Sequence, residues 1–125
     1  MTNLTDLTLS GTFILGGQTV LEKPTAETAT GATVTPAVKH GILTLNRAGA
    51  ITVTLNNPTA TTDDFKRLVI VGLQAQANII NCTTFGNGGA GENVATSNAV
   101  IGSSLALMAY QGYWYVTGFN EMTIA

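Results

Sequence analysis

Few residues of this sequence could carry chemistry, and the first to consider is a run of glycines. "GNGGAG" places Gly86, Gly88 and Gly91 at the spacing of a dinucleotide-binding loop, after an apolar segment that could be a strand. Such a site also needs a helix whose N-terminus holds the pyrophosphate, and an acidic residue about 20 positions further on. No acidic residue lies between Glu92 and Glu121. We therefore expect a glycine-rich loop without a bound nucleotide.

Metal binding is also not expected. Two neighbouring carboxylates, Asp63 and Asp64, could bind a hard cation, but no D-x-D-x-D pattern surrounds them, so a solvated turn is predicted. One histidine and one cysteine are too few for the usual zinc sites within one chain. Cys82 has apolar neighbours and no basic residue near it in sequence, which predicts a buried, unreactive thiol. The sequence thus predicts no metal and no cofactor.

A catalytic triad is the remaining form of enzyme chemistry to consider. His40 could act with Ser10 or Ser97 and an aspartate, because triads are defined by geometry rather than by chain order. The sequence has no G-x-S-x-G nucleophile elbow, and a lone histidine before a glycine is typical of a loop. We therefore expect no enzymatic activity.

Composition and charge argue against several partners. Charged residues make up 10% of the chain, against about 25% in ordinary soluble domains. The five Lys and Arg residues are spread thinly, so neither nucleic acid nor an anionic membrane is expected as a partner. The apolar run "RLVIVGL" is too short for a transmembrane helix. The first residues, "MTNLTDLTLSG", lack the basic and apolar regions of a secretory signal, so we expect a protein made in the cytoplasm.

The elements expected from the sequence are strands. Threonine is the commonest residue, at 21 of 125, and with 14 glycines it disfavours long helices and suits a pleated sheet. Residues 41–57, "GILTLNRAGAITVTLNN", alternate apolar and polar residues in two runs, which predicts two half-buried strands joined in a hairpin at "NRAGA". The continuous apolar run 65–73 predicts a strand buried on both faces, and residues 78–85 predict another.

Six to eight short strands separated by turn residues predict an all-β fold over residues 41–125, either a small β-sandwich or a barrel-like domain. Residues 1–40 are predicted to form an extended N-terminal arm and a linker rich in threonine and alanine. Within the arm, apolar residues recur in loose alternation: Leu4, Leu7, Leu9 and Phe13. An extended segment of this kind could add main-chain hydrogen bonds to the sheet edge of a neighbouring subunit.

The last two strands, in "SLALMAYQGYWYVTG" (residues 104–118), carry apolar residues on both faces. A two-residue turn at 111–112 sets Tyr110 opposite Tyr113 and Met108 opposite Tyr115. One face then carries Leu107, Ala109, Trp114 and Val116, and the other carries Ala106, Met108 and the three tyrosines. A sheet face in contact with water is normally polar, so the second face needs a cover. Either the chain covers it, or Met108, Tyr110, Tyr113 and Tyr115 form a subunit interface.

These motifs, in their order along the chain, carry a resemblance. An "ITVTL" strand, Asn-Pro, an Asp-Asp turn, an "LVIV" strand, a glycine-rich loop and an "AYQGYWYV" hairpin follow one another between about residues 41 and 118. This order is similar to the β-rich domain that recurs in virion surface proteins of tailed bacteriophages. The likeness is greatest to head-decoration (cement) proteins and extends to head fibres and tail appendages.

The resemblance implies a homotrimer without enzymatic activity, made in the host cytoplasm and attached to the capsid exterior, with the major capsid protein as its partner. The tyrosine face would join the three chains, and the N-terminal arm would bind the capsid lattice. Preferential binding to the mature shell would stabilise it. The alternative is a host-recognition module of a tail fibre or head fibre, whose exposed Tyr and Trp rings bind carbohydrate. Burial of Trp114 would favour the structural role.

Overall fold

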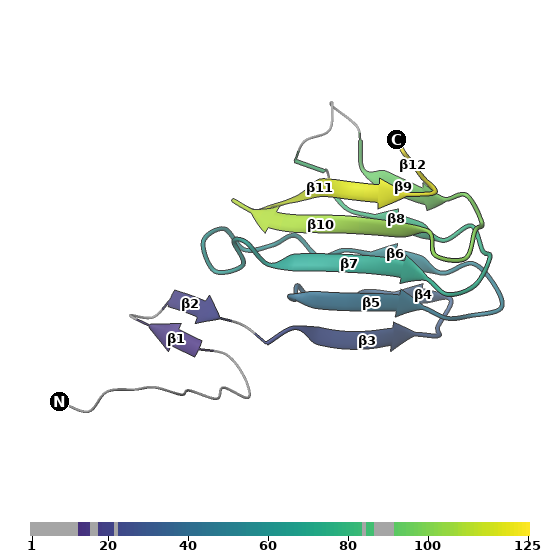
Figure 1. The fold of residues 1–125 in the computed structure, drawn as a ribbon. Coiled ribbons are helices and arrows are strands. Elements are labelled where there is room, and N and C mark those ends of the chain that lie inside the picture. Colours follow the sequence, from purple (N-terminus) through teal and green to yellow (C-terminus); the bar gives the residue numbers. More distant parts are fainter. Residues whose placement is uncertain (1–12, 16–17, 22, 84, 87–91) are drawn as a thin grey trace.

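The computed structural model describes residues 13–15, 18–21, 23–83, 85–86 and 92–125 (Figure 1). Its strands are β1 (Phe13–Leu15), β2 (Gln18–Leu21), β3 (Thr25–Ala29), β4 (Thr33–Val34), β5 (Gly41–Leu45), β6 (Thr52–Thr54), β7 (Arg67–Gly72), β8 (Ile79–Asn81), β9 (Val94–Ser97), β10 (Ser104–Tyr110), β11 (Tyr113–Asn120) and β12 (Met122–Ile124). The predicted all-β class is confirmed, since these residues form strands, turns and loops without a helix. Accordingly, no helix in this part of the chain could cross a membrane.

Ten of the described strands form two facing sheets of five, which makes the fold a sandwich rather than a closed barrel. The first sheet has the order β11-β10-β7-β5-β3 and lies nearer to the viewer in Figure 1. The second sheet, behind it, has the order β12-β9-β8-β6-β4. The strands β1 and β2 pair with each other as an antiparallel hairpin.

Consecutive strands form three units, β3-β4, β5-β6 and β7-β8, whose two members lie in different sheets. The chain therefore winds through the two sheets like the turns of a short solenoid. The first strand of each unit joins the first sheet, and the second strand joins the second sheet. Corresponding strands of successive units run parallel, so that Leu43 of β5 lies beside Ile70 of β7, and Val53 of β6 lies beside Ile80 of β8. Each turn of the chain therefore contributes apolar side chains to both walls of one core.

The hairpin predicted at "NRAGA" is wrong, because β5 and β6 lie in different sheets. Both strands alternate as predicted, and their apolar side chains Leu43, Leu45 and Val53 are buried. They face the same core from opposite walls, however, so residues 46–50 cross from one sheet to the other. Alternation within a strand reports which face is buried, and it is silent on which strand is the hydrogen-bonded neighbour.

After β8 the chain reverses direction, and antiparallel strands complete both sheets. In the second sheet β9 pairs with β8 and β12 pairs with β9, while in the first sheet β10 pairs with β7 and β11 pairs with β10. The predicted register of the last hairpin is confirmed: Tyr110 opposes Tyr113, and Met108 opposes Tyr115. Gln111 and Gly112 have φ angles of 48° and 85°, as a type I′ turn requires.

The core between the sheets is sealed at one side by the predicted inner face of that hairpin. Leu107, Ala109 and Trp114 are each at most 1% exposed, and Val116 packs against them. The indole Nε1 of Trp114 donates to the carbonyl oxygen of Asn56 at 2.9 Å, which satisfies its polar atom. Burial of Trp114 is the outcome that favours a structural role over stacking on a ligand.

Two further expectations differ from the structure. The strand within residues 65–73 is buried on one face only, since Leu68 and Ile70 are buried while Val69 and Val71 are half-buried. The boundary of the β-domain lies before residue 41, because β3 and β4 fall in the predicted linker and yet pair with β5 and β6. Backbone hydrogen bonds rather than side-chain burial hold β3 in place, since Ala29 is its single buried residue.

The packing of β5 against β3 generates a stability prediction at Gly41. A Cβ atom added there would lie 1.8 Å from the carbonyl oxygen of Thr25, so the strands must move apart to accept any side chain. We expect Gly41→Ala to lower the free energy of unfolding by about 1–3 kcal/mol, measured by urea denaturation. Gly118→Ala is the matched control, because nothing lies within 4 Å of a Cβ at that position. Equal stability of the two variants would contradict the close approach of β3 and β5.

Candidate assembly surface

The outer face of the first sheet is largely apolar. Ile42 of β5, Val69 of β7 and Ala106 of β10 lie side by side in one cross-strand row. Ile42 is 37% exposed, and Val69, Ala106 and Met108 are half-buried. All-parallel sheets normally have both faces covered, and a water-facing side of an antiparallel sheet is normally polar. The two sheets cover each other's inner faces, whereas these outer side chains remain within reach of solvent.

The four residues predicted to form a subunit interface lie on this outer face, but they are not equally exposed. Tyr110 and Tyr113 are 41% and 47% exposed, whereas Met108 and Tyr115 are half-buried. The rings of Tyr110 and Tyr115 are 6.4 Å apart. Tyr115 also packs on the backbone of Gly86, where an added Cβ would lie 2.6 Å from the ring. The chain therefore covers part of Tyr115 itself and leaves Tyr110 and Tyr113 open.

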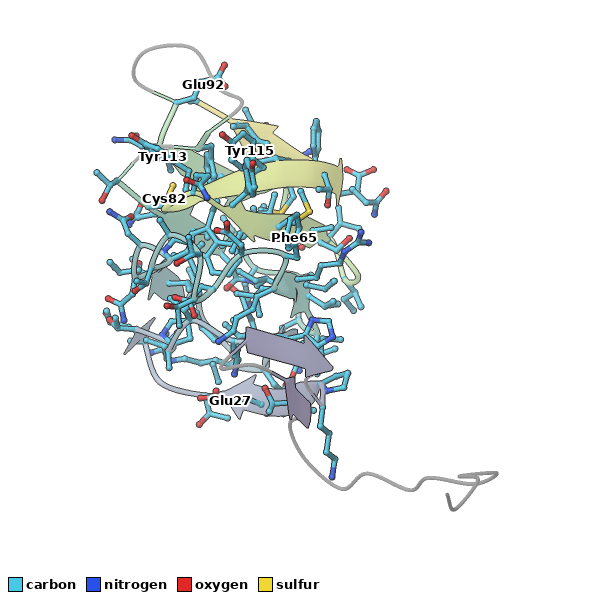
Figure 2. The ribbon with its side chains drawn as sticks, turned by 90° about the vertical axis from the view of Figure 1, so that its left-hand side faces the viewer. Glu27, Phe65, Cys82, Glu92, Tyr113 and Tyr115 are labelled. Atoms are coloured by element: carbon cyan, nitrogen blue, oxygen red, sulfur yellow. The ribbon has the colours of Figure 1, made fainter. Side chains whose placement is uncertain are left out.

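An aromatic residue that the sequence placed in a buried strand joins this surface. Phe65 precedes β7 and is 67% exposed, with its ring centroid 5.7 Å from that of Tyr110. Figure 2 shows Phe65 below Tyr113 and Tyr115 and well above Glu27. We call Phe65, Tyr110, Tyr113 and Tyr115, together with Met108, the aromatic surface. Phe65 was missed from the sequence because it reads there as the start of the buried run 65–73.

The backbone of Phe65 has a φ of 69°, in the left-handed region that bulky residues rarely adopt. Such a conformation costs about 1–3 kcal/mol and persists where neighbouring contacts enforce it. The amide of Phe65 donates to the carbonyl oxygen of Ala109 at 2.7 Å, which ties the loop to β10. The carboxylate of Asp64 accepts from the amide of Gln111 at 2.7 Å and from its side-chain Nε2 at 2.8 Å. Phe65 is therefore held beside the β10–β11 turn.

Asp63 is buried inside the same loop and binds two of its residues. The prediction that it lies in a solvated turn is therefore wrong. Asp63 is only 8% exposed, because its carboxylate accepts from the amide of Thr59 at 2.7 Å and from the Nζ of Lys66 at 2.9 Å. Burial disfavours the charged carboxylate, but the Thr59 amide and the Lys66 ammonium outweigh burial and lower the pKa of Asp63 below its ordinary value of 3.8. Both partners lie close to Asp63 along the chain, so the Asp63 carboxylate stabilises the conformation of this loop.

The opposite edge of the first sheet carries charge instead of apolar side chains. Glu27 of β3 lies on the core-facing side, in register with the buried Leu43, yet it remains exposed and forms an ion pair with Lys39. In Figure 2 Glu27 lies at the far end of the molecule from the aromatic surface. An inward-facing charge on an edge strand opposes the addition of another strand. This edge is therefore poorly suited to apolar stacking.

Of the residues considered for catalysis, His40 and Ser97 have structural partners, and Ser10 lies outside the described residues. The Nδ1 of His40 accepts from the amide of Arg67 at 3.2 Å. Ser97 is buried in β9, and its hydroxyl donates to Ser103 at 2.7 Å. Cys82 is buried, as predicted. In the described ranges no group of three or more His, Cys, Asp and Glu side chains could hold a metal ion.

Two predicted features fall largely outside the described residues. Of the "GNGGAG" run, Gly86 alone is described, and its amide donates to the carbonyl oxygen of Trp114 at 2.8 Å. Among the residues predicted to anchor the arm, Leu4, Leu7 and Leu9 lie outside the described residues, and Phe13 is the first residue of β1.

Two comparisons with known proteins found no relative. No protein-family model matches the chain, and no curated protein matches it significantly.

The lowered pKa of Asp63 generates a prediction about acid stability. A carboxylate whose pKa is lowered on folding stabilises the fold fully above its unfolded pKa, and this contribution is lost as the pH falls through the folded value. We expect Asp63→Asn to lower the free energy of unfolding at pH 7 by about 1–3 kcal/mol, and the difference from the unmodified chain to shrink progressively below about pH 4. Urea denaturation across this pH range measures it.

Glu121→Gln is the control for this titration, since the Glu121 side chain is exposed and has no ion-pair partner within the described part of the chain. A stability difference for Asp63→Asn that stays constant between pH 7 and pH 3 would contradict the stabilising role of the charged carboxylate.

Proposed function

We propose that this protein is a structural component of a virion, a homotrimer that decorates and stabilises the capsid exterior of a tailed bacteriophage and has no enzymatic activity. The observation that carries the proposal is the aromatic surface on the outer face of the first sheet. Aromatic residues and methionine are enriched at protein interfaces, whereas an outer sheet face that stays in water is normally polar. The core does not depend on these rings, because the opposite face of the hairpin already supplies it with apolar side chains.

The outer face supplies only part of a standard subunit contact, and the remainder must come from neighbouring surface. Five strands and the seven residues of β10 give a face about 20 Å wide and about 23 Å long. The loop that presents Phe65 extends this face at one end. A stable interface of standard size buries about 800 Å² per partner, a modest part of the 7200 Å² accessible surface of this chain.

The capsid part of the proposal rests on the order of motifs between about residues 41 and 118 and on their likeness to head-decoration proteins. A trimer that binds the mature shell, and binds its precursors less well, stabilises that shell by mass action without any chemical step. In this proposal the arm residues Leu4, Leu7, Leu9 and Phe13 bind the major capsid protein, and the aromatic surface joins the trimer.

Host recognition through carbohydrate is a second candidate, favoured by the rigid presentation of exposed rings. Phe65, Tyr110 and Tyr113 could stack on the apolar faces of sugars. Trp114, the largest ring, is 1% exposed and its N–H is bonded within the chain, so it is not available to a ligand. The burial of this residue is why we place the structural role first.

The trimer generates a prediction about mass. Light scattering after gel filtration should give a mass near three times 12.9 kDa. We expect Phe65→Ser and Tyr110→Ser to weaken the trimer by about tenfold or more, while the thermal melting temperature of the monomer changes little, because both side chains are exposed. Ile101→Ser is the matched control, since Ile101 is also 67% exposed but lies in the turn before β10.

A monomer at every concentration, or an equal effect of Ile101→Ser, would contradict the aromatic surface as the trimer contact. Binding of the unmodified chain to a glycan array, lost in Phe65→Ser, would favour the recognition function instead.

Capsid binding is tested separately by co-sedimentation with undecorated bacteriophage capsids. We expect the unmodified chain to sediment with them and Leu7→Ser/Leu9→Ser to remain in the supernatant as an intact trimer, because the arm loses its apolar contacts. Thr5→Ser/Thr8→Ser is the control in the same segment. Equal binding of both double variants would place the capsid contact elsewhere.

A further inference from the structure

A second apolar feature lies at the end of the sandwich remote from Glu27. A groove of about 360 Å³ opens between β11, the last strand of the first sheet, and β12, the last strand of the second. Its apolar lining comes from Phe85, Val116, Phe119 and Ile124, and Glu92 contributes a carboxylate. The groove is therefore the open end of the core, where the two sheets stop and no further strand pair closes them in the described structure.

Phe119 shows why this end stays open. It opposes Leu105 across the β10–β11 pair and so shares the core-facing side with a residue that is fully buried. Phe119 itself is 58% exposed, because β11 is the edge strand of its sheet and the described bridge to its outer edge, made by Phe85, lies at Trp114 and not at Phe119. The groove thus offers an apolar ring and an apolar floor to an incoming side chain.

The charges around the two apolar features are complementary. Arg67 lies on the outer face of the first sheet, opposite Met108, and its side chain is exposed. Glu92 lies in the groove lining and is exposed as well. Neither side chain has an ion-pair partner among the described residues. Within the described residues, a cation without an ion-pair partner thus lies beside the aromatic surface, and an anion without one lies at the groove.

Symmetry requires a second surface if the chain is a trimer. A two-fold contact joins the same patch on both subunits, but a three-fold ring is built from heterologous contacts, in which one patch meets a different patch on the next subunit. The aromatic surface therefore needs a complementary surface elsewhere on the same chain. The groove has the required apolar lining and the opposite charge.

We propose that Phe65 and its neighbour Tyr110 insert into the β11–β12 groove of the next copy of this chain, with Arg67 of one subunit paired with Glu92 of the next. This inference rests on the proposed trimer and specifies how its subunits meet. Hydrogen bonds already fix the loop that presents Phe65, so little conformational entropy is lost when Phe65 docks. Three such contacts close a ring and leave no unpaired groove, which prevents growth into a filament.

A charge exchange tests the pairing by light scattering of full-length chains. We expect Arg67→Glu and Glu92→Arg each to weaken the trimer by about tenfold or more, since each places like charges together. The double variant Arg67→Glu/Glu92→Arg should recover most of the loss. Glu121→Arg is the control, because it makes the same charge change outside the groove lining.

Mixing two apolar variants tests the heterologous geometry independently of charge. Phe65→Ser lacks the side chain that docks and Phe119→Ser alters the groove, so each alone should be monomeric at concentrations at which the unmodified chain is trimeric. The mixture should form species with the mass of two chains, because one intact Phe65 meets one intact groove and the ring cannot close.

The outcomes separate this inference from the function on which it rests. A trimer that Phe65→Ser disrupts and that Phe119→Ser and Glu92→Arg leave intact would overturn the groove contact and keep the proposed trimer. A stable dimer would overturn the heterologous contact, since a two-fold interface pairs the aromatic surface with itself. A monomer at all concentrations would overturn both proposals.

Discussion

The stacking of successive strand pairs around one core is the constraint on which the rest of the structure depends. Each strand has two faces, and the core takes one of them. Once Leu43, Leu68 and Ile70 face inward, Ile42 and Val69 must face outward, whatever their hydropathy. If the outer face of this sheet were exposed to water, polar residues would be expected at these positions. The core therefore does not require their apolar character, and the proposed assembly with another protein surface would account for it.

The reversal after β8 links this core to the aromatic surface. The antiparallel hairpin β10–β11 places Trp114 in the core, where its indole N–H bonds to Asn56, in the segment that leads into the loop of Asp63 and Phe65. The same loop is bound to the hairpin turn through Asp64 and Gln111. Folding the core thus positions the exposed rings, and the strain at Phe65 is offset by hydrogen bonds that also stabilise the hairpin. A surface prepared in this way loses little entropy when it meets a partner.

The two ends of the sandwich are chemically different, which bears on how copies of the chain could pack. At the β3 edge the Glu27–Lys39 ion pair places charge where another turn of strands would need an apolar side chain. At the β11–β12 end the core is open and carries an exposed phenylalanine. End-to-end stacking of identical copies is therefore disfavoured, because it would bury the charged end against the apolar one. The proposed lateral contacts between the aromatic surface and the groove would avoid that cost and close into a ring.

The sequence by itself determined the properties that depend on residues close together along the chain. Alternation and threonine content predicted an all-β chain, and a turn at Gln111–Gly112 predicted the register of the last hairpin, which in turn predicted that Trp114 faces inward and Tyr110 outward. The tertiary structure alone decided which strands are neighbours: β5 and β6 read as a hairpin although they lie in opposite sheets, and β3 is held by backbone pairing that its polar sequence does not show. It also decided that Asp63 is buried and Phe65 exposed. The physical reason is that alternation reports the burial of a face, whereas strand pairing, a left-handed backbone and a groove between two sheet edges depend on contacts between distant segments.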